Sequence, residues 1–228
     1  MVGDFWGWRT HMISFSRGEN IEIAGLSLAQ TMGWSTCFDI CSEVYVHDLD
    51  ICSHVKNGDG VNFRSGCHHC RIENITGNTS DDTVACTALS VKGKKFRFNP
   101  LSKGLYPSEP YNCTGHGGSR DIHDITIRNI ATGGKMHGVI CLAARGNQVY
   151  NVTIENIEEQ HEGYRESTVK IYTGYGDGYS AGDLHDITVR NVTGRMSKYA
   201  VQTNAEIANV NLENITQLNP EGELTTGF

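Results

Sequence analysis

The stretch Ile125-Thr-Ile-Arg-Asn-Ile130 decides the fold, because its pattern recurs along the chain. In each copy the first, third and sixth residues are apolar, and the fifth is Asn, Asp or Gly. The copies are Ile21–Leu26, Val44–Leu49, Cys70–Ile75, Ile125–Ile130, Val152–Ile157, Ile187–Val192 and Val210–Ile215. Alternate apolar residues form a short strand with one inward face, and the fifth residue tolerates the left-handed backbone of a corner. We therefore expect stacked coils whose corner side chains hydrogen-bond from rung to rung.

The spacing of the copies indicates which repeat fold this is. They begin 23 to 35 residues apart, except for one interval of 55 residues that splits if Phe96–Leu101 is a degenerate copy. This period is too short for a propeller blade, and no helical pattern intervenes. Strand-like segments also lie between the copies: Trp34–Phe38, Gly60–Arg64, Thr83–Thr87, Gly138–Leu142, Thr168–Tyr172 and Ala200–Thr203. Since one coil cannot bury its own apolar face, the sequence predicts an all-β, right-handed parallel β-helix of about eight to nine coils.

The composition supports a single domain over residues 1–228. The chain is 38% hydrophobic and 20% charged, which suits a protein with a real core rather than a disordered one. We expect a long loop at 91–118 and a second loop at 174–182. Both should leave from the side of the second strand set, where a cleft is expected.

Charge and hydropathy exclude several functions. A net charge of −7 without a basic cluster argues against nucleic-acid binding. The longest apolar run, Val139–Ala144, is far shorter than the ~20 residues of a membrane helix. Cys67-His-His-Cys70 has the spacing of a zinc knuckle, but no second ligand pair follows. We therefore expect no membrane partner, no cofactor and no metal.

The cysteines and the N-terminus bear on location. Eight cysteines are too few for a disulfide scaffold, and several lie in apolar strand-like runs. The first residues show neither a basic start nor an apolar stretch typical of a signal peptide. These features favour the cytoplasm, or secretion if the N-terminus is truncated.

Polar motifs precede or open strands of the second set in three successive coils. They are Asn57-Gly-Asp59-Gly60, Ser80-Asp81-Asp82 and Gly115-His116-Gly117. In a coil stack their offsets place them above one another, a few strand spacings of ~4.8 Å apart. Neighbouring carboxylates raise one another's proton affinity, which suits the acid and base of glycoside hydrolysis. The alternative is that these residues are ordinary turn formers.

These motifs resemble glycoside hydrolase family 28, the polygalacturonase and rhamnogalacturonan hydrolase group. The N-G-D-G, S-D-D and G-H-G motifs are similar to the family's N-T-D-G, G/Q-D-D and G-H-G. Arg9–Phe15 and Glu19–Leu26 resemble its R-P-x-x-I-x-F and N-I-x-I-x-G-L stretch. The resemblance runs over about residues 9–160. It implies a parallel β-helix that cleaves a pectic or related acidic polysaccharide or oligosaccharide with inversion.

The resemblance also implies roles for four residues. Asp81 is the general acid that protonates the glycosidic oxygen. Asp59 and Asp82 hold and activate the attacking water. His116 tunes the acid or binds sugar.

The sequence departs from the family where the substrate carboxylate is held. The family's G-V-R-I-K strand falls on Gly138–Leu142, so Ile140 and Leu142 replace the basic pair. A buried carboxylate without a cation is costly. We expect other residues to bind the substrate, and the candidates are Asn57, Arg64, Arg145 and Lys170.

The chain is also short for the family, which indicates a truncated or minimal member. Exposed end coils predict either a monomer or end-to-end association. Two alternatives to a hydrolase stay open. One is a catalytically inactive β-helix that binds carbohydrate or serves as a structural module, and the other is a polysaccharide lyase or epimerase.

Overall fold

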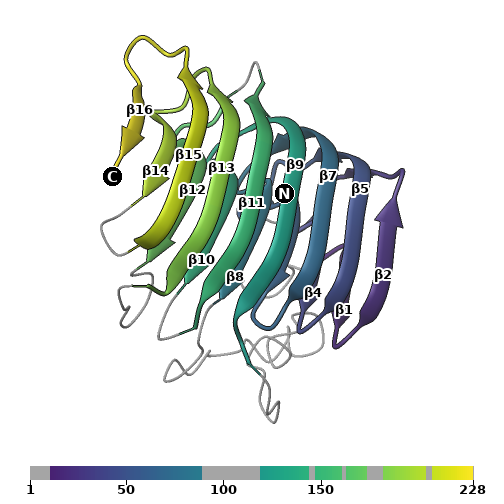
Figure 1. Ribbon diagram of the computed structural model, residues 1–228. Coiled ribbons are helices and arrows are strands. Elements are labelled where there is room, and N and C mark those ends of the chain that lie inside the picture. The colour runs from purple at the N-terminus through teal and green to yellow at the C-terminus, as the bar shows by residue number, and fades with distance from the viewer. Residues whose placement is uncertain are drawn as a thin grey trace, which may run out of the picture.

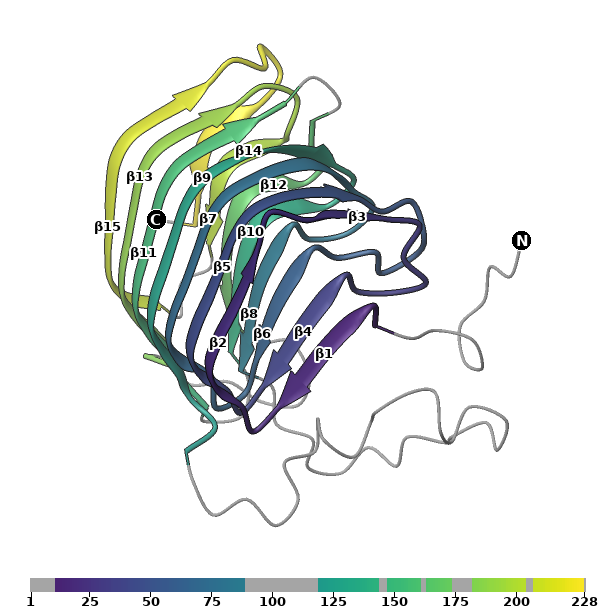
Figure 2. The same cartoon turned by 90° about the vertical axis from the view of Figure 1, so that its right-hand side faces the viewer.

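The computed structural model describes residues 11–88, 119–143, 147–160, 163–173, 182–203 and 207–227. Within these ranges all regular structure is β-strand, and the strands form two parallel sheets around one apolar core (Figures 1 and 2). Each coil from β1 (Ile13–Ser16) to β15 (Ile207–Gln217) contributes one strand to each sheet, and β16 (Glu223–Thr226) adds a last strand to the first sheet. The predicted right-handed parallel β-helix is confirmed.

The first sheet, called sheet A, contains the second strand set of the sequence. Its eight strands stack in the order β1 (Ile13–Ser16), β4 (Thr36–Asp39), β6 (Val61–Arg64), β8 (Val84–Ala88), β10 (His137–Ala143), β12 (Ser167–Thr173), β14 (Tyr199–Thr203) and β16 (Glu223–Thr226). Eight strands give eight rungs, within the expected range. Alternate residues of each strand enter the core, so Phe38 and Phe63 are fully buried.

The second sheet, called sheet B, contains the repeated template. Its strands are β2 (Glu19–Ala24), β5 (Ser42–Cys52), β7 (His68–Thr79), β9 (Ile122–Gly134), β11 (Val149–Glu159), β13 (Leu184–Gly194) and β15 (Ile207–Gln217). Short strand β3 (Ser27–Ala29) pairs with β5 beside this path. The template apolar residues, such as Ile127 and Ile130, are fully buried against sheet A.

The long interval in the repeat does not contain an extra rung. Strand β7 pairs directly with β9, with Ile75 opposite Ile130, and β8 pairs directly with β10. The interpretation of Phe96–Leu101 as a degenerate copy is therefore wrong. Residues 89–118 instead interrupt a single coil between β8 and β9, and they lie outside the described residues.

The corner role of the fifth template residue is confirmed at every copy. All seven of these residues have positive φ: Gly25, Asp48, Asn74, Asn129, Asn156, Asn191 and Asn214. The six side chains other than Gly25 form a continuous ladder in which each amide donates to the side-chain oxygen of the rung before it. These bonds are 2.9 to 3.1 Å long. The ladder fixes the register of sheet B because a slipped rung would lose two bonds.

A second row of corners was missed by sequence reasoning. The residue immediately before each template copy also has positive φ: Asn20, Glu43, His69, Asp124, Asn151, Asp186 and Asn209. The side chains of Asn151 and Asn209 donate to Asp124 and Asp186 on the preceding rungs. The sequence does show a polar residue before every template copy. The pattern was missed because the residue type varies between copies, with His69 and Glu43 among the Asn and Asp residues.

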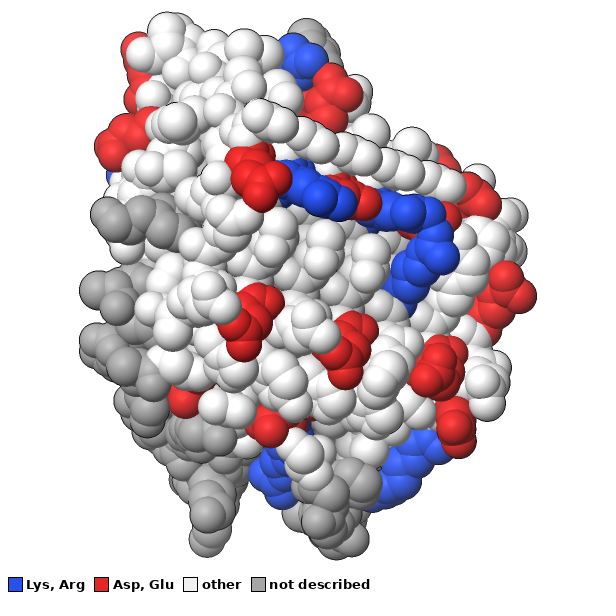
Figure 3. Space-filling model, viewed as in Figure 1, with Lys and Arg blue, Asp and Glu red and all other residues white. Residues whose placement is uncertain are grey.

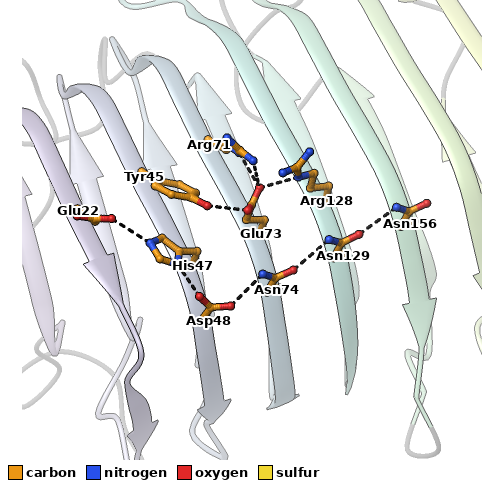
Figure 4. A network of polar contacts seen from close by, with 10 residues as sticks. All are labelled: Glu22, Tyr45, His47, Asp48, Arg71, Glu73, Asn74, Arg128, Asn129 and Asn156. Atoms are coloured by element: carbon orange, nitrogen blue, oxygen red, sulfur yellow. Dashed lines mark hydrogen bonds and ion pairs between the residues drawn. The ribbon is translucent and has the colours of Figure 1, made fainter.

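Charged side chains follow the ladder on the solvent face of sheet B. In register across the strands lie His47, Glu73, Arg128, Glu155 and Arg190. Figure 3 shows a band of basic and acidic side chains running across this face. Tyr45 and the two arginines, Arg71 and Arg128, all donate to the Glu73 carboxylate at 2.6 Å (Figure 4). Burial opposes ionisation of Glu73, but these hydrogen bonds outweigh it and lower its pKa to about 2.

The Asn ladder yields a stability prediction at its midpoint. Asn129 has φ +57° and both donates to Asn74 and accepts from Asn156. We expect Asn129→Ala to lower the free energy of unfolding by roughly 2 kcal/mol, since it loses both bonds and retains a Cβ in the left-handed region. Asn129→Gly relieves the backbone and should cost less. Urea denaturation monitored by circular dichroism checks this order, and equal stability of Asn129→Ala and wild type would contradict it.

Candidate active site at the start of sheet A

The candidate site lies where three successive strands of sheet A begin. The backbone amides of Ser35, Gly60 and Thr83 donate to the carbonyls of Asp59 (2.8 Å), Asp82 (2.9 Å) and His137 (3.0 Å), respectively. These bonds place Asp59, Asp82 and His137 at the same position of neighbouring rungs. Rungs are ~4.8 Å apart, so the two carboxylates and the imidazole form one row.

Two glycines allow the carboxylate-bearing turns to pack closely. A Cβ on Gly58 would lie 2.5 Å from Ser80 Oγ, and one on Gly60 would lie 2.4 Å from the Thr83 carbonyl oxygen. Both distances are too short for any side chain. The glycines of the N-G-D-G motif thus bring Asp59 against the next turn, which goes beyond an ordinary turn role.

Asp59 is the most buried carboxylate of the site. It is 5% exposed, and its Oδ1 has no hydrogen-bond partner among the described residues. Burial raises the pKa of Asp59 well above its usual range, and the charges of Asp82 and Asp81 raise it further. Asp59 therefore holds a proton under conditions in which an ordinary Asp is ionised.

Asp81 and Asp82 have different partners. Asn57 donates to Asp81 Oδ2 at 3.1 Å, across the rung boundary. Asp82 Oδ1 accepts a 2.7 Å bond from Nδ1 of His137. The carboxylate side chain is 15% exposed and the imidazole is 5% exposed. An ionised carboxylate can only accept, so this contact assigns the Nδ1 proton to the histidine.

Sequence reasoning missed His137. The expected histidine was His116, which lies outside the described residues. His137 stands directly before Gly138, where a segment of the second strand set begins. This His-Gly pair at the start of a strand is the sequence feature that could have identified it.

Arg64 lies one rung to the N-terminal side of Asp82, on the outer face of sheet A. Its guanidinium carbon is 5.1 Å from the ring centroid of Trp34. The Trp34 ring also contacts His11, with centroids 4.6 Å apart. Burial and the Arg64 charge together lower the pKa of His11 to about 4, so that this imidazole is neutral at neutral pH. Arg64 and Trp34 thus form a cationic and aromatic border beside Asp59.

Lys170 lies on the other side of the carboxylates, on β12. It is in register with Ile140, the position where the family resemblance predicted a basic residue. Its ammonium is 4.9 Å from the Tyr172 ring. Ile140 and Leu142 are 7% and 6% exposed and pack with Ala85 and Tyr172. A cation is therefore present one rung beyond the place where it was expected.

Some predicted features fall outside the described residues. These are Arg145, the loop at 91–118, and the loop at 174–182 except for Gly182. Cys67 and Cys70 of the zinc-knuckle-like motif are buried in the core, whereas His68 and His69 bond to one another at 2.7 Å. Within the described ranges, no group of three or more His, Cys, Asp or Glu side chains is arranged to hold a metal. No helix there is long and apolar enough to cross a membrane.

A surface hollow lies away from these carboxylates. It runs beside the Asn ladder on sheet B, has a volume of about 550 Å³ and is lined by Gly25, Leu26, Ser27, Asp48, Leu49, Asp50, Asn74, Thr76 and Asn129. Its acidic side chains are engaged in the ladder or bonded to Thr76. The row at the start of sheet A is the better candidate for catalysis, because there the buried Asp59 has a pKa raised by burial and by the charges of Asp82 and Asp81.

The fold has a solved counterpart. The hyperthermoactive exopolygalacturonase from Thermotoga maritima superposes with a TM-score of 0.52 at 15% sequence identity. The match covers 90% of this chain and 50% of that chain, so the present chain spans half the length of the enzyme. A likeness at this identity shows a shared fold. No protein-family model matches the sequence. No curated protein matches it either.

Proposed function

We propose that this protein is a glycoside hydrolase that cleaves a pectic or related acidic glycan with inversion at the anomeric carbon. The observation that carries the proposal is the row at the start of sheet A. Asp59 and Asp82 lie on neighbouring rungs with Asp81 beside them, and Asp59 has a raised pKa. Carboxylates with separated proton affinities are what acid–base glycoside hydrolysis needs. The exopolygalacturonase with the same fold adds support by analogy.

The proposed reaction uses two carboxyl groups and one water. Asp81 donates its proton to the glycosidic oxygen as the bond from that oxygen to the anomeric carbon breaks. The water attacks the anomeric carbon from the opposite face and passes a proton to Asp82, or to Asp59 at a pH high enough for Asp59 to be ionised. The products are two saturated sugars, one with inverted configuration, and the carboxyl groups exchange one proton with solvent to return to their starting state.

His137 has a supporting role in this scheme. Its Nδ1–H donates to Asp82 Oδ1 at 2.7 Å, which fixes the orientation of that carboxyl group. A carboxyl group held in one orientation is suited to hold the water.

The preference for an acidic glycan rests on the cations beside the row. Arg64 lies on β6 and Lys170 lies on β12, so positive charge is present on both sides of Asp82 along the stack. A glycan lying across the rungs would meet one at each side, and a uronate carboxylate would pair with either. The Trp34 ring lies against the Arg64 guanidinium, which helps to hold this cation beside the row.

The experiment is a digest of polygalacturonate and rhamnogalacturonan oligosaccharides, followed by mass spectrometry and by proton NMR of the new anomeric centre. We expect saturated products whose first-formed anomer is inverted. Retained configuration would contradict the proposed mechanism, and unsaturated products absorbing ultraviolet light would indicate a lyase.

A binding module without catalysis is the second candidate. The apolar cluster of Ile140, Leu142, Ala85 and Tyr172 favours it, because Ile140 and Leu142 occupy the positions where the family resemblance predicted a basic pair. Calorimetric binding of an oligosaccharide by folded wild type that releases no product would support this second function over the first.

A further inference from the structure

Tyr164 lies beneath the candidate site, between β11 and β12. It is 1% exposed and the largest of the fully buried side chains among the described residues. Its ring contacts two glycines that flank His137. A Cβ on Gly134 would lie 2.8 Å from one edge of the ring, and a Cβ on Gly138 would lie 3.1 Å from the other. The ring therefore supports the turn that carries the imidazole.

The Tyr164 hydroxyl joins a buried network of threonines. It contacts Thr83 Oγ1 at 2.7 Å and also bonds to Thr132. Thr83 Oγ1 contacts Thr79 Oγ1 at 2.9 Å, and Thr79 Oγ1 donates to the backbone carbonyl of Asp81 at 3.0 Å. All three threonines are no more than 1% exposed. The network thus ends on the backbone of the proposed acid.

The last bond sets the direction of every proton in this network. Since Thr79 donates to Asp81, its oxygen accepts from Thr83. Thr83 in turn accepts from Tyr164, and Thr132, whose hydroxyl also lies 3.2 Å from Thr83 Oγ1, shares its one proton between Tyr164 and Thr83. Burial raises the pKa of Tyr164, so the phenol keeps the proton that it must donate. The Tyr164 hydroxyl therefore begins a series of hydrogen bonds that runs through Thr83 and Thr79 to the backbone of Asp81. In so buried a place these bonds are made by the protein itself.

The negative charge of Asp82 is among the causes that raise the pKa of Tyr164, which places the phenol within the electrostatic reach of the site. Thr83 is also the residue after Asp82. A single buried side chain thus touches the turn of His137, the neighbour of Asp82 and, through Thr79, the backbone of Asp81.

We propose that Tyr164 is a positioning residue that holds Asp81, Asp82 and His137 in mutual register from beneath. This inference rests on the proposed hydrolase function of that row. The phenol does not meet substrate. It links a turn between β11 and β12 to turns that precede β8 and β10, so that the three side chains keep their alignment when a glycan binds.

The test compares wild type with Tyr164→Phe, which keeps the ring and removes the hydroxyl. We expect kcat to fall roughly 10- to 100-fold with KM almost unchanged, because misalignment affects the reaction step more than binding. We also expect the NMR signal of the His137 Nδ1 proton, which is held by Asp82 in the wild type, to shift and broaden. Tyr150→Phe, on sheet B, is the matched control and should match wild type in both measurements.

The outcomes separate this inference from the proposed function. A variant with lower thermal stability but wild-type kcat and an unchanged Nδ1 signal would show a merely structural role and overturn the inference. If wild type cleaves no glycan, the proposed hydrolase function fails, and the Nδ1 signal alone still decides whether Tyr164 aligns the row. Should Tyr164→Phe fold poorly, Thr132→Val removes one donor to the phenol and is measured in the same two ways.

Discussion

Asp81→Asn is expected to lower kcat on the cleaved glycan by about 10³-fold, with little change in KM. The amide is nearly the same size as the carboxyl group but cannot give a proton to a leaving oxygen. Asn57 lies within hydrogen-bond distance of Asp81 Oδ2, and the new side chain can keep that contact through its own oxygen. Initial rates under saturating substrate, read by reducing-sugar release, measure the effect.

Asp50→Asn is the matched control for this loss. Asp50 is exposed on sheet B, and its carboxylate accepts from Thr76 at 2.9 Å, far from the row. We expect this variant to retain wild-type kcat. If Asp81→Asn also kept full activity, Asp81 would not be the acid and the role would pass to Asp59, whose raised pKa makes it the next donor.

Asp59→Asn is expected to abolish most activity and yet to raise the free energy of unfolding at neutral pH by about 1–2 kcal/mol. The wild-type carboxyl is buried and faces Asp82 and Asp81, which makes its ionised form unfavourable in the folded protein. An amide carries no charge and avoids that penalty. Stability and activity therefore change in opposite directions at one residue.

The pH dependence of this gain has a definite sign. Below the ordinary Asp pKa of 3.8, Asp59 is protonated in both the folded and the unfolded protein, and it contributes no difference. Above that pH the unfolded chain loses the proton while the folded protein keeps it, so wild-type stability falls as the pH rises toward the folded pKa. The advantage of Asp59→Asn should thus be absent in acid and largest near neutrality.

Thermal unfolding of both proteins from acid to neutral pH measures this trend. Stability differences that stay constant with pH would show that the pKa of Asp59 is not raised in the folded protein. Activity supplies a second check. If Asp59 acts as the base, wild-type kcat should rise with pH over a range higher than an ordinary Asp would give.

The fold could be predicted from the sequence because every coil repeats the same physical requirement. An inward apolar pair followed by a residue that accepts positive φ leaves few architectures open, and Asn74 and Asn129 both obey it at +57°. The strands of sheet A could be placed for the same reason. The carboxylates Asp59 and Asp82 could be aligned because each opens a strand on consecutive rungs.

The remainder of the site depended on which rungs are neighbours, and sequence spacing does not give that across a long insertion. Residues 89–118 separate β8 from β9, yet β8 pairs with β10, so His137 is one rung from Asp82 although 55 residues away. Lys170 was a candidate from the sequence, and only the pairing of β10 with β12 places it beside Ile140. Tyr164 gave no signal at all, because a lone aromatic residue between strands is indistinguishable from any other core residue.

Direct pairing of β7 with β9 and of β8 with β10 across that insertion has an evolutionary consequence. Each rung is held by its two neighbours, so a segment can grow out of one coil without altering the hydrogen bonds on either side. Selection can therefore rewrite the inserted residues while the register that aligns Asp59, Asp82 and His137 is inherited unchanged. The solenoid separates the part of the gene that is free to vary from the part that must be preserved.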